Sequence, residues 1–141
     1  MNCIATALLR VSTALSFLTC GYAHAADPAG LWQSESDLSR YQVRHCGQRI
    51  CVRVAGLPEG PAVRDVHNPD PSLRSRAVIG IDIISASKGA EDNSWVGPAY
   101  SFRSGQTVGS RLQLEDDNRL SLTVCLLDGL FCMVQKMTRL E

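Results

Sequence analysis

The sequence predicts an all-β fold, an antiparallel barrel or sandwich of about eight short strands. Apolar and polar residues alternate with a period of two along most of the chain, as expected of strands that bury one face. Gly, Asn and Asp separate the alternating runs where tight hairpins need them, in CGQR, RSGQ and DDNR. A proline-rich stretch, residues 56–76, interrupts this pattern.

The strands are expected in segments that follow one another along the chain. In RYQVRH, for example, Tyr41, Val43 and His45 share one face of the strand. Short runs at this spacing favour antiparallel pairing of neighbours. The segments are GLWQSE, RYQVRH, ICVRVA, IGIDIISA, SWVGPAYSF, TVGSRLQLE, RLSLTVCL and FCMVQKMT.

The proline-rich stretch is expected to be a long loop that contains one short helical turn. Asp70 followed by Pro71 is the pattern of a helix N-cap with proline at the first helical position, so PSLRS is expected to form that turn. A loop this long in a small barrel is usually a lid, a plug or a functional loop.

Two arginines in this loop, Arg74 and Arg76, lie two positions apart. Residues at this spacing do not share a helix face, so one arginine should point inward. A buried guanidinium needs a partner, and Asp65 and Asp82 are the nearest carboxylates in sequence. The inward arginine therefore either tethers the loop to the barrel through one of them or contacts an anionic group of a ligand.

Residues 1–25 have the pattern of a secretory signal peptide. They contain no acidic residue, Arg10 precedes a weakly apolar run, and AHA, ending at Ala25, fits a cleavage site. A retained membrane anchor and a lipoprotein modified at Cys20 are the alternatives. Cleavage leaves a single domain, residues 26–141, in the periplasm or outside the cell, with no membrane span. The whole chain has 14 basic and 14 acidic residues, so no basic field indicates nucleic-acid binding.

Four cysteines remain after cleavage, and they are expected to form two disulfides, Cys46–Cys51 and Cys125–Cys132. If each pair flanks a hairpin loop, both cysteines lie on the same face and opposite each other across the two strands. A zinc site needs closer spacing or supporting histidines, and a redox centre needs C-x-x-C. Metal and redox roles are therefore the weaker interpretations.

The sequence shows no catalytic constellation, so an enzyme is the least favoured class. His45 is expected to be a half-buried strand residue and not a partner of Cys46, because neighbouring strand residues face opposite ways. His67 lies near Asp65, where turn and capping roles are simpler than acid–base chemistry. The acidic LEDDNRL stretch lacks the ligand spacing of a calcium loop. The sequence predicts no cofactor and no metal.

Six side chains are candidates for contact with a ligand. The aromatic ones lie in or near strands, and a barrel of eight strands is either filled by side chains or holds one small ligand. Core packing is the alternative for these aromatic residues, and the tether is the alternative for the arginines. The candidates are Trp32, Tyr41, Trp95, Tyr100, Arg74 and Arg76.

Several stretches together resemble a known family. They are GLW, YQVRHCGQRIC, HNPDPSLRSRAVIGIDII, W-x-G at residues 95–97, SGQT and KMTRL. Across nearly all of residues 29–140 the chain resembles the bacterial family called domain of unknown function 2147, and N-P-D-P-x-L-R-x-R is the most specific part of the resemblance. The resemblance implies a secreted or periplasmic protein with a lipocalin-like, up-and-down β-barrel and no established biochemical activity.

The chain departs from the family's pattern at several positions. Val52 stands where the family usually has Gly, Val108 where a Tyr is expected and Met137 where a Trp is expected. Pro98 replaces a Gly, and Ser-Phe at residues 101–102 replaces Asp-Pro. The chain therefore resembles a divergent member of the family.

The expected function is the non-enzymatic binding of a small apolar or amphipathic ligand, within the barrel or beneath the proline-rich loop. The alternative is a protein–protein interaction or inhibitor module of the cell envelope that acts through exposed loops. The expected partner is therefore a small apolar ligand or an envelope protein. A large internal cavity favours the first function, and a filled barrel with a protruding loop favours the second.

Overall fold

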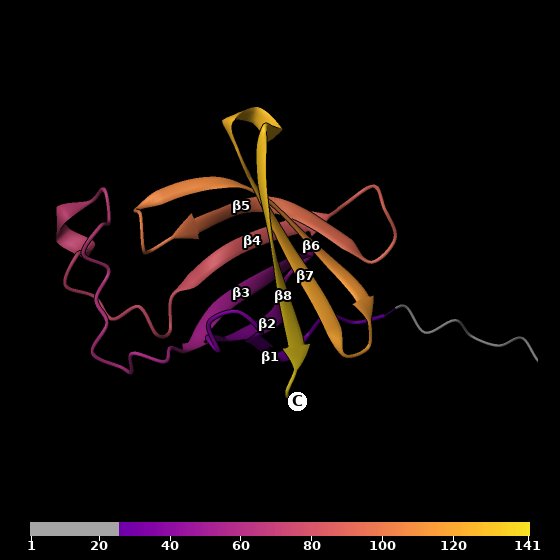
Figure 1. The fold of residues 1–141 in the computed structure, drawn as a ribbon, viewed down its shortest axis with the longest axis horizontal. Helices are drawn as coiled ribbons and strands as arrows, with labels where there is room; N and C mark the ends of the chain where they lie inside the picture. Colours follow the sequence, from indigo (N-terminus) through magenta and orange to yellow (C-terminus); the bar gives the residue numbers. More distant parts are fainter. Residues whose placement is uncertain (1–25) are drawn as a thin grey trace, which may run out of the picture.

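Eight antiparallel strands close into a barrel in the computed structural model, which describes residues 26–141 (Figure 1). Each strand pairs with the next, and β8 pairs back with β1, so the predicted up-and-down barrel is confirmed. The strands are β1 (Gly30–Ser34), β2 (Arg40–Cys46), β3 (Arg49–Gly56), β4 (Asp82–Lys88), β5 (Ser94–Ser101), β6 (Gln106–Asp116), β7 (Arg119–Leu126) and β8 (Phe131–Arg139). The expected signal peptide, with Cys3 and Cys20, lies outside the described residues.

The hairpin turns form at the predicted Gly, Asn and Asp residues. Gly47 in the β2–β3 turn has a φ of +67° and Gly105 before β6 has a φ of +73°, values that glycine adopts without steric cost. A Cβ on Gly105 would also collide with the carbonyl oxygen of His67. Glycine therefore allows the β5–β6 turn to pack against the loop between β3 and β4.

The Cys46–Cys51 disulfide is present, but its two cysteines are not directly opposite each other. Cys46 is opposite Arg49 and Cys51 is opposite Arg44, so the bridge crosses the hairpin diagonally with its Cα atoms 5.9 Å apart. The expectation of directly opposed cysteines is wrong because the strand pairing continues down to a turn of two residues. Both cysteines still share one face of the hairpin.

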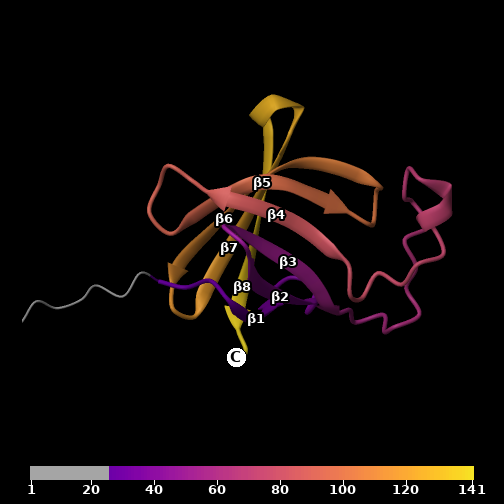
Figure 2. The same cartoon turned by 180° about the vertical axis from the view of Figure 1, so that it is seen from behind.

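The Cys125–Cys132 disulfide has the predicted register. Its cysteines are directly opposite each other, with Cα atoms 4.1 Å apart, and Leu120 is opposite Met137 farther down the same pair of strands. Beyond the disulfide the chain turns through a short 3-10 segment, η2 (Leu127–Gly129), which the sequence did not predict. The end of this hairpin stands out from the barrel when the molecule is seen from either side (Figure 2).

The proline-rich loop spans residues 57–81 and is folded onto the barrel. The predicted helical turn is present as η1 (Pro71–Leu73), and the Asp70 carboxylate caps it by accepting a 2.9 Å hydrogen bond from the backbone of Ser72. Val78 is fully buried in the hydrophobic core and fixes the end of the loop. β4 therefore begins three residues later than the expected strand segment at residue 79.

The alternating direction of the strands places the connections at two ends of the barrel. One end, here called the loop end, carries residues 35–39, 57–81, 102–105 and 127–130. The opposite end, here called the turn end, carries the β2–β3, β4–β5 and β6–β7 turns and the chain before β1. Buried side chains fill the barrel towards the turn end, among them Trp32, Val43 and Leu120.

Candidate functional site

A cavity of about 620 Å³ occupies the loop end of the barrel. Its volume lies within the range of about 300–1,000 Å³ that is typical of small-molecule sites. The wall is formed mainly by apolar side chains of β3 to β8. These include Val52, Ile84, Leu112, Leu122, Val124 and Met137. The barrel is thus packed at its turn end and hollow at its loop end.

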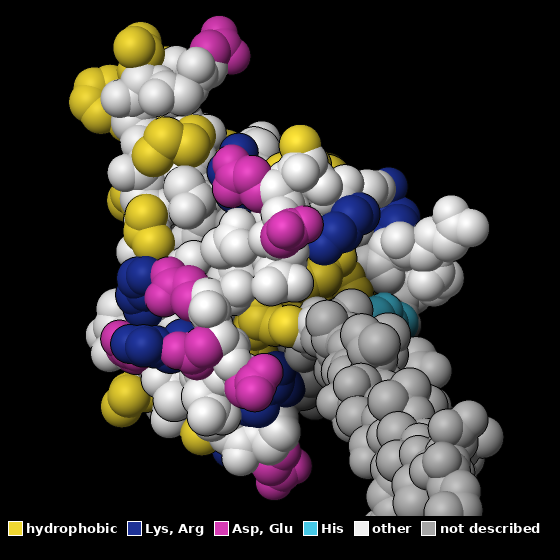
Figure 3. Space-filling view, turned by 90° about the vertical axis from the view of Figure 1, so that its right-hand side faces the viewer, with side chains coloured by type: hydrophobic (Ala, Val, Ile, Leu, Met, Phe, Trp, Pro, Cys, Tyr) yellow, Lys and Arg dark blue, Asp and Glu magenta, His cyan; other side chains and the backbone are white. Residues whose placement is uncertain are grey.

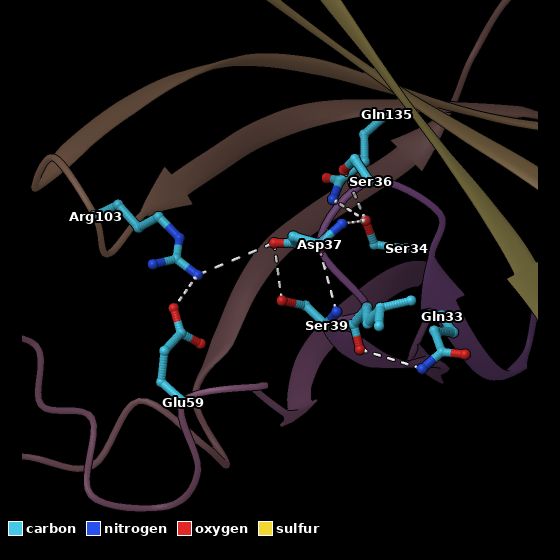
Figure 4. Close-up of polar contacts among 9 residues, drawn as sticks. Gln33, Ser34, Ser36, Asp37, Ser39, Glu59, Arg103 and Gln135 are labelled. Atoms are coloured by element: carbon cyan, nitrogen blue, oxygen red, sulfur yellow. Dashed lines mark hydrogen bonds and ion pairs between the residues drawn. The ribbon is translucent and has the colours of Figure 1, made fainter.

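Charged and polar side chains surround the mouth of this cavity (Figure 4). Arg103, in the β5–β6 turn, pairs with Glu59 of the proline-rich loop at 2.9 Å and lies 4.0 Å from the Asp37 carboxylate of the β1–β2 loop. One guanidinium therefore links three connections of the loop end. Ser36, Ser104 and other uncharged polar side chains complete the rim.

The Asp37 carboxylate is held in place by its own loop. It accepts hydrogen bonds from the backbone of Ser39 at 3.2 Å and from the Ser39 hydroxyl at 2.9 Å. Burial raises the pKa of Asp37, but the donors Ser34 and Ser39 outweigh this effect and leave the pKa below its ordinary value. Asp37 is therefore negatively charged at neutral pH and remains an ion-pair partner for Arg103.

Two of the predicted aromatic candidates, Tyr41 and Tyr100, line the cavity. Burial, followed by the charge of Asp37, raises the pKa of Tyr41. Burial, followed by a hydrogen bond to the Asp65 carboxylate, raises the pKa of Tyr100. Both phenols are therefore protonated at neutral pH and present neutral hydroxyl groups.

The carboxylate of Asp65, a residue of the proline-rich loop, is fully buried and is surrounded by donors. It accepts hydrogen bonds from the hydroxyl of Tyr100 at 2.6 Å and the amide of Asn68 at 2.8 Å, and it pairs with Arg76 at 2.8 Å. Burial raises the pKa of Asp65, but these donors outweigh it and hold the pKa below its ordinary value. An arginine–aspartate pair is therefore present between Arg76 and Asp65, but both residues belong to the loop, and the link to the barrel is the hydrogen bond from Tyr100 of β5.

Neither loop arginine is part of the cavity wall. Arg74 donates a 2.8 Å hydrogen bond from Nε to the backbone carbonyl of Asn68, and this bond closes the loop on itself. Asp82, the other expected partner, is on the outer surface and pairs with Arg44 and Arg53.

The two tryptophan candidates belong to the packed part of the barrel. Trp32 is fully buried, and its indole donates a 2.9 Å hydrogen bond to the carbonyl of Pro28. The guanidinium of Arg139 lies 4.2 Å from the centre of the Trp32 ring and covers it at the turn end. Trp95 is also buried, and Lys88 lies over its ring. Neither tryptophan is part of the cavity wall.

The two histidines among the described residues, His45 and His67, lie away from the cavity wall. His45 is exposed, not half-buried as expected, because it lies near the end of β2, where Nε2 contacts the Asp27 carboxylate at 2.9 Å. His67 is exposed, and the nearby Asp65 carboxylate is already bonded to other residues. Within residues 26–141, no three His, Cys, Asp or Glu side chains cluster in a way that would hold a metal ion.

Sequence reasoning missed the charged residues at the mouth, Asp37 and Arg103. A signal for them exists, because the connections of an up-and-down barrel alternate between its ends. The β1–β2 and β5–β6 connections must therefore meet at one end, and each contains one of these opposite charges.

The described residues contain no helix with the length and apolar character needed to cross a membrane. A protein-family model described as an uncharacterized protein conserved in bacteria (DUF2147) matches residues 30–139. No curated protein matches the chain.

Among solved structures, the chain is similar to protein HP1028 of Helicobacter pylori, which is described as belonging to the lipocalin family. The two chains are 22% identical and superpose with a TM-score of 0.73. The match covers 82% of this chain and 84% of that one. At this level of identity the likeness shows a lipocalin-like fold alone.

Proposed function

The chain belongs to the DUF2147 family of bacterial proteins, and from its fold and cavity we propose that it binds a small apolar or amphipathic ligand without catalysing a reaction. The cavity of about 620 Å³ is the observation that carries this proposal. Burial of an apolar ligand against its wall removes apolar surface from water, which is the main driving force for such binding.

The mouth of the cavity favours a ligand whose polar end is uncharged. Asp37 and Arg103 face each other there, and Glu59 also pairs with Arg103, so the arginine is already neutralised. An anionic headgroup would have to displace a carboxylate from Arg103. The hydroxyl of Ser104 and the amide of Gln106 instead offer hydrogen bonds to a neutral headgroup.

The ligand is expected to be particular to this chain within the family. Val52, Val108 and Met137, at which the chain departs from the family's pattern, all line the cavity. Their side chains set the size and shape of the space, so a ligand found for another family member would not transfer directly.

We place this function in the periplasm or outside the cell, after removal of residues 1–25. The Cys46–Cys51 and Cys125–Cys132 disulfides are compatible with an oxidising compartment. The alternative function, a protein–protein or inhibitor module that acts through exposed loops, receives less support because the barrel is hollow and Tyr100 and Val78 fix the proline-rich loop to it.

The first experiment is native mass spectrometry of the protein purified from the cells that make it, which should reveal a bound small molecule. The second is fluorescence titration with N-phenyl-1-naphthylamine, a neutral apolar dye. Leu122→Trp fills the cavity and should weaken dye binding by about tenfold or more. Val96→Trp is the matched control, because Val96 is exposed and outside the cavity wall. The proposal fails if neither a natural ligand nor the dye binds, or if the two variants bind the dye equally.

A further inference from the structure

The end of the β7–β8 hairpin exposes a group of large apolar side chains. We call residues 126–134 the hairpin tip. Leu127, Leu130 and Phe131 are 67%, 79% and 64% exposed, and Met133 and Val134 are also more than half exposed. Figure 3 shows hydrophobic side chains along this hairpin where it stands away from the rest of the molecule. Soluble monomers rarely expose contiguous apolar groups of this kind without a partner.

The backbone of the hairpin tip holds these side chains outward. Leu127 has a φ of +50°, in the left-handed region that leucine seldom adopts. Glycine or asparagine would fit this position at a lower energetic cost. The Cys125–Cys132 disulfide closes the base of the tip.

The apolar surface continues from the hairpin tip into the cavity. Leu126, Met133 and Val134 are exposed to solvent, and the same residues line the cavity wall. An apolar molecule at this side of the cavity therefore meets apolar side chains from the cavity wall to the tip.

We propose that the hairpin tip docks on the surface of a neutral lipid bilayer and inserts Leu127, Leu130 and Phe131 among its lipids. If the proposed function also holds, this docking lets the cavity exchange its ligand with the membrane. The docking itself rests on the tip and does not depend on the ligand.

The shape of the tip fits a fluid apolar phase better than a protein surface. Met133 is opposite Val124 on one face of the ribbon, and Val134 is opposite Thr123 on the other, yet both are more than half exposed. A rigid protein partner would cover one face of such a projection and leave the other in water. Lipids can surround both faces.

The charge of the tip selects the type of lipid. Asp128 is the one charged residue between Val124 and Gln135, and no Lys or Arg is present there. An anionic headgroup would be repelled by Asp128 and would find no basic side chain on the tip. Binding should therefore come from buried apolar surface, favour zwitterionic lipid and depend little on salt.

The test is vesicle flotation of the protein purified from the cells that make it, with phosphatidylcholine vesicles at low and high salt. The double variant Leu130→Ser/Phe131→Ser should lose about tenfold or more of the binding, because insertion scales with buried apolar area. Leu38→Ser/Val66→Ser is the matched control, since these residues are 61% and 57% exposed outside the tip. All three proteins carry the same N-terminus, so residues before Ala26 do not explain a difference between them.

Three results would overturn the docking proposal. One is equal flotation of the tip variant and the control, or no flotation of the wild-type protein. Another is flotation that requires anionic lipid or disappears at high salt. The third is a dimer in sedimentation equilibrium that the tip variant loses, because the tip would then bind a second copy. Leu130 and Phe131 do not line the cavity, so dye titration of the tip variant in solution tests the proposed function separately.

Discussion

The hydroxyl of Tyr100 donates a 2.6 Å hydrogen bond to the fully buried carboxylate of Asp65. Tyr100 belongs to β5 and lines the cavity, whereas Asp65 belongs to the proline-rich loop. Arg76 and Asn68, which also belong to the loop, bind the same carboxylate. The hydrogen bond from Tyr100 therefore joins this group of loop residues to the cavity wall. Changes at this point should therefore alter the stability of the loop and of the cavity together.

The first prediction concerns the different contributions of the two loop arginines, Arg76 and Arg74, to stability. Arg76→Met removes the cation from the buried Asp65 carboxylate, and we expect it to lower the free energy of unfolding by about 2–4 kcal/mol. The expected loss is below that of a fully buried pair because the Arg76 side chain is 36% exposed and water screens part of the interaction.

Arg74→Met is the matched control for this prediction. Arg74 contacts a backbone carbonyl and, among residues 26–141, no carboxylate within hydrogen-bond distance, so the loss should be below about 1.5 kcal/mol. Urea unfolding of both variants gives the comparison. Equal losses would mean that the Asp65 pair does not hold the loop.

The second prediction concerns pH. The pKa of Asp65 is below its ordinary value of 3.8 in the folded protein. Its charge therefore contributes stability that is present above the unfolded pKa and is lost as the pH falls through the folded pKa. We expect the stability difference between wild type and Asp65→Asn to be constant from pH 7 to pH 5 and to shrink below about pH 4. Urea unfolding of both proteins across this range measures it, and a difference that grows at low pH would contradict the assignment.

Much of the fold follows from local patterns in the sequence. The alternation in β7 and β8 places Cys125 opposite Cys132 and Leu120 opposite Met137, because both constraints require the same register. The helical turn after Asp70 follows from capping chemistry alone. Cys46 and Cys51 show the limit of this reasoning. A bridge is possible both directly across a ladder and diagonally, and the length of the turn decides between them.

The division of the barrel into a packed and a hollow half could not be predicted from the strand pattern. Trp32 and Tyr41 are paired neighbours on β1 and β2, yet Tyr41 lines the cavity and Trp32 does not. The indole of Trp32 is drawn to the turn end by the carbonyl of Pro28 and the guanidinium of Arg139. These partners come from opposite ends of the described chain, and alternation carries no information about them.

The third prediction compares the two disulfides. Their half-cysteines are 5 and 7 residues apart, so the chain-entropy model gives each about 2–2.5 kcal/mol. Replacing Cys46 and Cys51 by serine should cost about that amount, because β3 is held by pairing with β4 and cannot open alone.

Replacing Cys125 and Cys132 by serine should cost less than about 1 kcal/mol. The end of that hairpin stands out from the barrel, so it can fray locally and regain entropy in the folded state. Calorimetry of the two double variants measures both losses, after peptide mapping has verified the two bridges in the wild-type protein. A larger loss for the second pair would show that the hairpin tip is rigidly supported.

The last prediction concerns the ion pairs at the mouth of the cavity. Arg103 connects the β5–β6 turn to Glu59 and faces Asp37 across the opening, so its removal should make the opening easier to cross. Arg103→Met keeps an unbranched aliphatic side chain and removes the guanidinium, which pairs with Glu59 and lies over the Phe102 ring. We expect the bound dye to leave about threefold faster or more, since changes within one site act mostly on the dissociation rate. Stability should hardly change, because exposed ion pairs contribute little to it. Arg111→Met is the control, since Arg111 forms a similar pair with Glu91 outside the cavity wall. Stopped-flow displacement of the dye measures the rate, and equal rates for the two variants would show that the Arg103 pairs do not close the mouth.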